Sequence, residues 1–303
     1  MNEVTTVTLP NGHIIGYAEY GTPTGLPVIA LHGMPNTHLM WKGIDQAARD
    51  GNIRLIAPDR AGYGYSTCGL PPTLIDYADD IRGLADALRL GKFVIMGASG
   101  GGPYAYACAY KLADRLLAAV ILSSMPPLFQ TRYAAQMESM NRLVFRLGKI
   151  SPVLTSFLLT TMLRTSLLSM RKHAQQHTSP SPDIPPAVCA VLTEDLTEVV
   201  RSSRKGIASD LRLYWRAWGF NFEDIPTRVL LWHGEADTLS PVTAAHQIAA
   251  RLPTVECHFC PNEGHVEPLT KHIHEVFARI STLVLNTETI TRAAVQLEPS
   301  PQP

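Results

Sequence analysis

The amino-acid sequence predicts an α/β fold in which a mostly parallel central sheet is flanked by helices and carries an inserted helical cap. Two patterns support this prediction. Short apolar runs of strand length alternate with helical patterns over most of the chain, which is typical of parallel strands joined by helices. The alternation stops between residues 126 and 224, where helical periods continue without a strand pattern. An all-helical stretch inside a sheet domain predicts an insertion.

We therefore expect four parts along the chain. Residues 1–125 and 225–285 should form the two parts of one sheet domain, and residues 126–224 should form the cap. The tail at 286–303 is polar and ends in a proline-rich run, so it is expected to be disordered. A chain of 303 residues, 46% of them hydrophobic, is long enough to bury a core of this kind.

The expected sheet begins with a hairpin. The β-rich runs Val4 to Leu9 and His13 to Tyr20 are separated by Pro10-Asn11-Gly12, which is a turn signal. The strands that follow are apolar throughout, a pattern that indicates strands covered on both faces. They are expected at Pro27–Leu31, Arg54–Ala57, Phe93–Met96, Ala118–Leu122, Arg228–Trp232 and Val255–Cys260, and helices are expected at Leu74–Leu90, Gly102–Leu112, Val242–Leu252 and Val266–Leu285.

The insertion is expected to contain helices over Gln130–Leu147, Val153–Met170 and Ala187–Phe220. The run from Ser179 to Pro186 has too many prolines to continue a helix and should be a loop. Val153–Met170 has a single charge, Arg164, but its serines and threonines and its modest length argue against a membrane span. We expect this helix to be buried or to face a pocket.

Composition and charge exclude several classes of function. Lys and Arg together equal Asp and Glu at 26 each, and no Lys/Arg-rich run occurs, so no nucleic-acid partner is expected. Polar residues interrupt the first thirty positions, so neither a secretory signal peptide nor a transit peptide is predicted, and the expected location is cytoplasmic. No transmembrane segment is expected. The five cysteines are expected to be reduced thiols, and Cys257 and Cys260 should point to opposite faces of a strand, so no metal site is predicted.

The sequence Gly97-Ala98-Ser99-Gly100-Gly101 follows a predicted strand and precedes a predicted helix. A tight turn between the two elements should force Ser99 into a strained backbone conformation with its hydroxyl exposed above the sheet, and only small neighbours leave room for that turn. The amides at the start of the helix favour a developing oxyanion. Ser99 is therefore the predicted nucleophile.

A serine nucleophile needs a base, and that base needs an acid to orient it. His265 lies just after the last predicted strand, on the same sheet edge as Ser99. Asp237 follows the preceding strand at that edge, with Glu235 as the nearest alternative acid. We predict that His265 is the base and Asp237 its acid, in the chain order nucleophile, acid, histidine.

Acyl transfer also needs two donors for the oxyanion. The amide of Gly100, directly after the nucleophile, is the first predicted donor. The second is the amide of Met34 in the loop His32-Gly33-Met34-Pro35, where glycine permits close approach of the backbone and the proline can hold a tight or cis turn.

Together with Asp59-Arg60-Ala61-Gly62-Tyr63-Gly64-Tyr65-Ser66 and His233-Gly234-Glu235-Ala236-Asp237, these motifs make the chain resemble the α/β-hydrolase superfamily, in its capped branch of serine esterase-like enzymes. The resemblance spans residues 28 to 285 and implies that the Asp59–Ser66 segment is mainly a structural turn. Serine rather than aspartate at position 99 departs from the haloalkane dehalogenase and epoxide hydrolase branches. The chain carries no dinucleotide fingerprint and no HExxH motif, so no cofactor is expected.

The expected function is hydrolysis of a small or medium carboxylic ester, with lactones and thioesters as further candidates. Two alternatives stay open: the same triad used for C–C bond hydrolysis, cyclisation or acyl transfer, and a receptor-like binding protein with little turnover. The expected partner is a small molecule, and the oligomeric state is not predicted. The pocket walls are expected to include Trp41, Met125, Phe157, Met162 and Trp218.

Overall fold

The computed structural model describes residues 3–67, 69–175 and 186–296. Its centre is an eight-stranded sheet in the order β1-β2-β4-β3-β5-β6-β7-β8. The pairs from β4 through β3, β5, β6 and β7 to β8 are parallel, whereas β2 is antiparallel to both of its neighbours. The prediction of a mostly parallel sheet with an antiparallel N-terminal hairpin is confirmed. The strands are β1 Thr5–Thr8, β2 Ile14–Gly21, β3 Leu26–Leu31, β4 Ile53–Pro58, β5 Phe93–Ala98, β6 Leu116–Leu122, β7 Val229–Gly234 and β8 Val255–Cys260.

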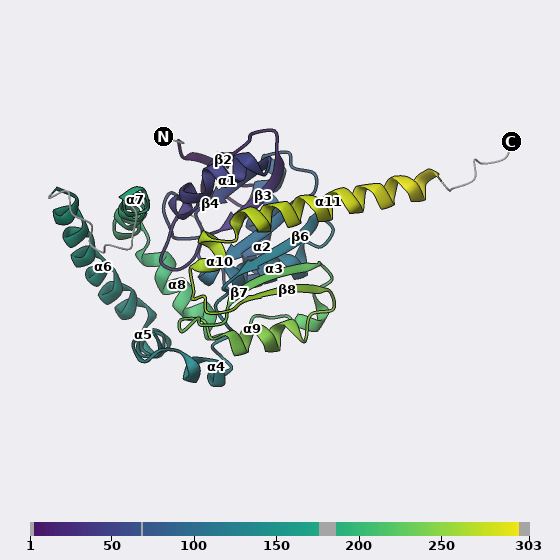
Figure 1. Ribbon diagram of the computed structural model, residues 1–303. Coiled ribbons are helices and arrows are strands. Elements are labelled where there is room, and N and C mark those ends of the chain that lie inside the picture. Colours follow the sequence, from purple (N-terminus) through teal and green to yellow (C-terminus); the bar gives the residue numbers. More distant parts are fainter. Residues whose placement is uncertain (1–2, 68, 176–185, 297–303) are drawn as a thin grey trace.

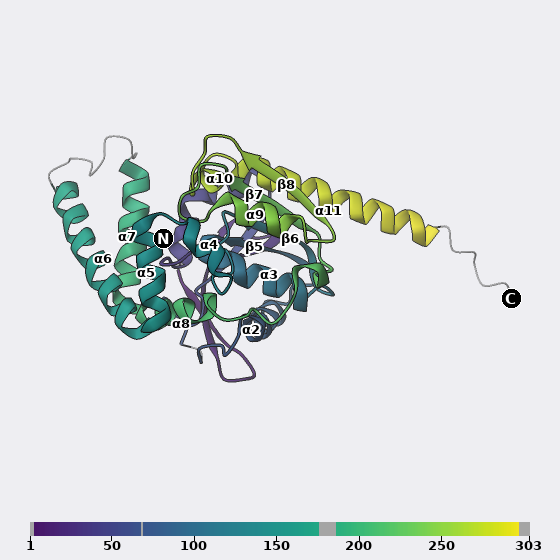
Figure 2. The same cartoon turned by 90° about the horizontal axis from the view of Figure 1, so that it is seen from below.

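Helices cover both faces of the sheet (Figures 1 and 2). One hydrophobic cluster joins the sheet to α2 Leu74–Ala87, α3 Gly102–Lys111 and α9 Val242–Ala249. A second cluster on the other face joins it to the 3-10 helix η1 His38–Ile44, to α1 Asp45–Asp50 and to α11 Ile273–Gln296. All six residues of β5 are buried, which explains its uninterrupted apolar sequence.

Local signals set the start of α2. The Thr73 hydroxyl accepts a hydrogen bond from the Asp76 amide, and the Asp76 carboxylate accepts one from the Thr73 amide at 2.9 Å. This capping box satisfies backbone donors that the first turn of a helix leaves unpaired. The helix therefore begins at Leu74, where the sequence pattern predicts it.

The segment between β6 and β7 is helical in its described parts and lies to one side of the sheet (Figure 1). Its helices are α4 Thr131–Gln136, α5 Ser139–Ile150, α6 Pro152–Gln175, α7 Pro186–Ser202, α8 Arg204–Tyr214 and the short η3 Phe222–Asp224. The expected helix Gln130–Leu147 is divided into α4 and α5, and the expected helix Ala187–Phe220 is divided into α7 and α8. The predicted proline-rich loop from Ser179 falls mainly outside the described residues.

Helix α6 is mostly exposed, whereas the sequence predicts a helix that is buried or faces a pocket. Only 22% of its most apolar window is buried, and large apolar side chains such as Val153, Leu154 and Leu168 are exposed. Within the parts of the chain that the structure describes, Pro152–Lys172 is the one helical stretch long and apolar enough to cross a membrane by length and composition. A periodic apolar stripe predicts a helix but not what covers it.

The end of the chain also differs from the expectation. A short helix, α10 Glu267–Thr270, follows β8, and α11 then continues to Gln296 instead of ending near Leu285. The sequence from Asn286 to Gln296 contains neither proline nor glycine, so nothing local ends the helix there. The rest of the expected disordered tail, residues 297–303, lies outside the described residues.

Candidate active site

Ser99 lies at the turn between β5 and α3, with φ at +50°, in the left-handed region that non-glycine residues rarely adopt. A methyl group on Gly101 would lie 2.2 Å from the Leu31 carbonyl oxygen, and one on Gly97 would lie 2.6 Å from that of Gly101. Only glycine fits at both positions. The Ser99 carbonyl accepts a hydrogen bond from the Met125 amide at 2.9 Å, which helps to hold the strained turn.

His265 connects Ser99 to Asp237. Its Nε2 lies 2.9 Å from Ser99 Oγ, and its Nδ1 lies 2.7 Å from Asp237 Oδ2. An ionised carboxylate can only accept hydrogen bonds, so Nδ1 carries the proton and Nε2 of the neutral ring is left to accept the Ser99 hydroxyl proton. The three side chains that the sequence predicts to act together therefore form one hydrogen-bonded chain.

The surroundings of Asp237 keep it ionised. Its side chain is fully buried, which alone would raise its pKa, but hydrogen bonds from His233 and His265 and from the Ser240 amide hold the pKa well below the ordinary range. The Leu239 amide also donates to Oδ1 at 2.9 Å. His233, at the end of β7, lies 3.3 Å from Asp237 Oδ2; sequence reasoning gave it no role. The sequence signal that could have identified His233 is its position directly after a predicted strand and four residues before Asp237.

The two predicted oxyanion donors lie beside each other. A methyl group on Gly100 would lie 2.9 Å from the Met34 backbone nitrogen, and one on Gly33 would lie 3.3 Å from Ser99 Cβ. The Met34–Pro35 peptide bond is cis, as the sequence allows. The Tyr214 hydroxyl on α8 donates to the Gly100 carbonyl at 2.9 Å. The loop after β3 thus packs directly against the nucleophile turn.

A buried ionic network that sequence reasoning missed holds this loop. Arg60 Nε donates to the His32 carbonyl at 3.1 Å and its Nη2 to the Gly33 carbonyl at 3.2 Å. Its Nη1 donates to Asp210 on α8 at 2.6 Å, and Asp210 also accepts from the Tyr63 hydroxyl at 2.6 Å. Arg60 and Asp210 are 150 positions apart, so no local pattern could pair them.

Two of the five pocket candidates lie in the hydrophobic core. Trp41 is fully buried among the side chains on the α1 and α11 face. Trp218 is 3% exposed and packs against Tyr106 and Phe222, with ring centroids 6.5 and 5.8 Å away. Both indole rings therefore contribute to core packing.

The other three candidates are divided between the surface and the site. Phe157 and Met162 on α6 are 48% and 55% exposed, and the Phe157 ring lies under the Arg204 guanidinium at 5.1 Å. These two side chains occupy the exposed surface of the helical segment. Met125 is buried, and its backbone amide donates the hydrogen bond to the Ser99 carbonyl described above. Of the five, Met125 is the candidate whose backbone contacts Ser99.

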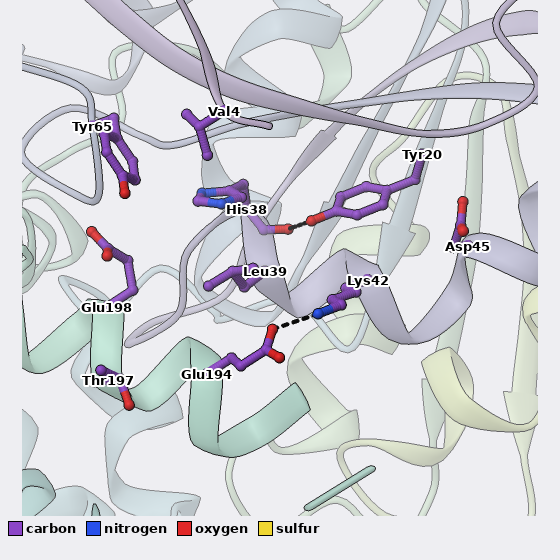
Figure 3. A pocket seen from close by; sticks show the side chains of 10 residues that line it. All are labelled: Val4, Tyr20, His38, Leu39, Lys42, Asp45, Tyr65, Glu194, Thr197 and Glu198. Atoms are coloured by element: carbon purple, nitrogen blue, oxygen red, sulfur yellow. Dashed lines mark hydrogen bonds and ion pairs between the residues drawn. The ribbon is translucent and has the colours of Figure 1, made fainter. Parts of the chain in front are cut away.

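A cavity of about 580 Å³ lies between η1 and α7, and Figure 3 shows its lining. Its walls include His38, Lys42, Tyr65, Glu194 and Glu198, and none of the lining residues belongs to the Ser99, His265 and Asp237 chain. Lys42 pairs with Glu194 at 2.5 Å, and Glu198 pairs with Arg201 at 2.6 Å. The charges in this cavity are therefore compensated locally, and it is distinct from the candidate active site.

Of the cysteines with described side chains, Cys257 is exposed, whereas Cys108 and Cys260 are buried. Cys257 and Cys260 thus point to opposite faces of β8, as expected for residues three apart on a strand. In the described part of the chain, one group of side chains has donor atoms placed for a metal ion: Cys260, Glu263 and His272.

Known proteins share this fold. A family model described as alpha/beta hydrolase fold matches residues 27–271. A non-heme chloroperoxidase of Streptomyces lividans is 37% identical over 126 residues, which are 40% of this chain and 45% of that protein. Haloalkane dehalogenase 2 of Mycobacterium tuberculosis is 34% identical over 109 residues, which are 35% of this chain and 37% of that protein. The match therefore spans less than half the length of these relatives. The structure of a putative aryl esterase from Burkholderia cenocepacia aligns with a TM-score of 0.70 at 19% identity, covering 93% of this chain and 99% of that one. The chain belongs to the alpha/beta hydrolase fold family.

Proposed function

We propose that this protein is a serine hydrolase that cleaves a small or medium carboxylic ester through an acyl-enzyme intermediate. The observation that carries the proposal is the hydrogen-bonded chain from Ser99 Oγ through His265 to Asp237. A serine hydroxyl is a weak nucleophile until a base removes its proton, and this arrangement supplies both the base and the acid that orients it.

In the proposed reaction, Ser99 Oγ attacks the ester carbonyl carbon while His265 Nε2 takes the hydroxyl proton. The ionised Asp237 stabilises the imidazolium that forms. The alcohol leaves with the proton from His265, and a water molecule, deprotonated by the same nitrogen, then releases the acid and restores Ser99. The helical segment that carries α8 is proposed to act as the cap over this site.

The Met34 and Gly100 amides are proposed to stabilise the oxyanion. Support comes from the close packing of the two backbones and from the position of Gly100 in the 3-10 turn η2 Ser99–Gly101, which leads directly into α3 and forms the first turn of a helical segment, where amides lack helical partners. The relatives named above differ in their reactions. Serine at position 99, where the dehalogenase branch is expected to have aspartate, favours ester chemistry.

The proposal is tested by the hydrolysis of 4-nitrophenyl acetate and butyrate. Ser99→Ala should lower kcat by on the order of 10⁴-fold or more, because the acylated atom is lost. Ser281→Ala is the matched control: its hydroxyl bonds to Phe277 within α11, and activity should stay unchanged. Full ester hydrolysis by Ser99→Ala would refute the mechanism. Turnover of C–C or acyl-acceptor substrates with no ester hydrolysis would favour the first alternative.

A further inference from the structure

Cys260, Glu263 and His272 converge at the carboxyl end of β8. Cys260 is the last residue of the strand, Glu263 lies in the turn after it, and His272 immediately precedes α11. One donor atom from each, a sulfur, a carboxylate oxygen and an imidazole nitrogen, lies within 4.8 Å of the other two. Cys260 is buried, while the Glu263 and His272 side chains are 16% and 27% exposed. The cluster is thus enclosed by protein on one side and open to water on the other.

This donor set suits zinc. Zn²⁺ binds thiolate, imidazole and carboxylate at about 2.0 to 2.3 Å, which in a tetrahedron places the donors about 3.5 Å apart. His272 Nε2 is already 2.9 Å from Glu263 Oε2, and side-chain rotations would have to bring the three donors from within 4.8 Å of one another to the tetrahedral spacing. The hard cations Ca²⁺ and Mg²⁺ prefer oxygen ligands and fit a sulfur-containing set poorly. Lys271 also approaches Glu263, at 3.5 Å, but it is 57% exposed and can turn into solvent.

A second carboxylate supports the histidine. Glu275 Oε2 lies 3.1 Å from His272 Nδ1, on the side of the ring away from Glu263. Metal-bound histidines commonly donate their other N–H to a carboxylate, which fixes the tautomer and leaves Nε2 free to bind the metal. Glu275 also lies 3.4 Å from His258 Nδ1, so its carboxylate is held from two directions.

The turn that carries these ligands also supports the candidate active site. The Glu235 amide donates to the Cys260 carbonyl at 3.0 Å, and the Ala236 amide donates to the Glu263 carbonyl at 2.8 Å. Asp237 follows directly in the sequence, and His265 lies two positions after Glu263. A metal ion bound here would immobilise this turn, and the turn positions both the loop that carries Asp237 and the loop that carries His265.

We propose that Cys260, Glu263 and His272 form a Zn²⁺ site, with water as the fourth ligand, that braces the segment carrying His265. The Cys260 thiol releases its proton to solvent when the sulfur binds, and neutral His272 supplies the Nε2 lone pair while Nδ1–H donates to Glu275. The ion takes no part in bond cleavage at Ser99. Metal binding at this site does not require that Ser99 hydrolyse an ester.

The test uses the full chain, treated with a chelator and titrated with Co²⁺, which reports tetrahedral coordination and sulfur ligation by visible and near-ultraviolet absorption. The expected result is one equivalent of Co²⁺ with a thiolate charge-transfer band, displaced by Zn²⁺, and a Tm raised by Zn²⁺. Cys260→Ser should abolish the band. Cys257→Ser, which removes the exposed thiol three residues earlier, should keep it.

Two further variants test the proposal in case the Cys260→Ser protein does not fold. His272→Gln changes a partly exposed side chain and should abolish tight binding. Glu275→Gln should weaken Co²⁺ binding by about 10- to 100-fold, as loss of a supporting carboxylate usually does. Absence of stoichiometric Co²⁺ binding by the unsubstituted chain, or full affinity in both Cys260→Ser and His272→Gln, overturns the proposal. Neither Co²⁺ binding nor the rise in Tm with Zn²⁺ depends on Ser99.

Discussion

The Arg60 guanidinium donates a 2.6 Å hydrogen bond to the Asp210 carboxylate, and each of these side chains is 1% exposed. Arg60 lies on the loop after β4 and Asp210 on α8, so the pair joins the sheet domain to the helical segment. Through the carbonyls of His32 and Gly33, the same guanidinium holds the loop that carries the Met34 amide. A contact between distant parts of the chain thus shapes the candidate oxyanion site.

Asp210→Asn should strongly destabilise the protein. The substitution removes the negative charge and leaves Arg60 buried without its partner, which typically costs about 3 to 5 kcal/mol in the free energy of unfolding. Urea unfolding followed by circular dichroism measures the change. Asp114→Asn is the control, since it breaks an exposed pair with Arg82 and should have little effect. Equal stability of the two variants would contradict this reading.

Asp195 on α7 should make stability depend on pH. Burial raises its pKa to about 6, although hydrogen bonds from Asn36 and Thr37 act in the opposite direction. The pKa of an unfolded aspartate is about 3.9, so between about pH 4 and 6 the folded state binds more protons and loses stability as the pH rises. The cost at pH 7 is about 3 kcal/mol, from about two pKa units at 1.36 kcal/mol each.

Asp195→Asn removes this titration. The stability of the variant relative to the unsubstituted protein should therefore increase between pH 4 and pH 7, by about 3 kcal/mol. The measurement is the free energy of unfolding of both proteins at a series of pH values. A constant difference across that range would show that Asp195 has the same pKa in the folded and unfolded states, and it would contradict the raised pKa.

Gly100→Ala should disturb the candidate oxyanion site. The added methyl group would lie 2.5 Å from the Tyr214 hydroxyl and 2.9 Å from the Met34 nitrogen, so at least one of them must move. Displacement of one oxyanion donor lowers kcat by about 10²- to 10³-fold. Gly91→Ala is the control, because a methyl group there meets nothing within 4 Å. Steady-state ester hydrolysis by both variants, with folding checked by circular dichroism, decides the matter; unchanged kcat in Gly100→Ala would argue against these donors.

Local patterns made most of the sheet and the three central site residues predictable. The glycines around Ser99 are required by contacts within one turn, and strand ends of a parallel sheet meet at one edge, which brings Asp237 and His265 to the serine.

Features that depend on distant contacts could not be predicted from the sequence. The pairing of Arg60 with Asp210 and the burial of Asp195 against Thr37 arise only when the helical segment packs on the sheet domain. The core positions of Trp41 and Trp218, and the exposed face of α6, were also undetermined, because a large apolar residue can pack equally in a core, a pocket wall or a surface.

The central claim is that Ser99 is the nucleophile of an ester hydrolase, and labelling with a fluorophosphonate tests it most directly. One adduct per protein molecule, mapped by peptide mass spectrometry to Ser99, should appear while ester hydrolysis is lost in the same proportion, and Ser99→Ala should remain unlabelled. Ester hydrolysis that persists in fully labelled protein, or an adduct that maps to another residue while activity is lost, would contradict the account. Labelling of Ser99 in a protein that turns over no ester would contradict it in favour of a receptor-like binding protein.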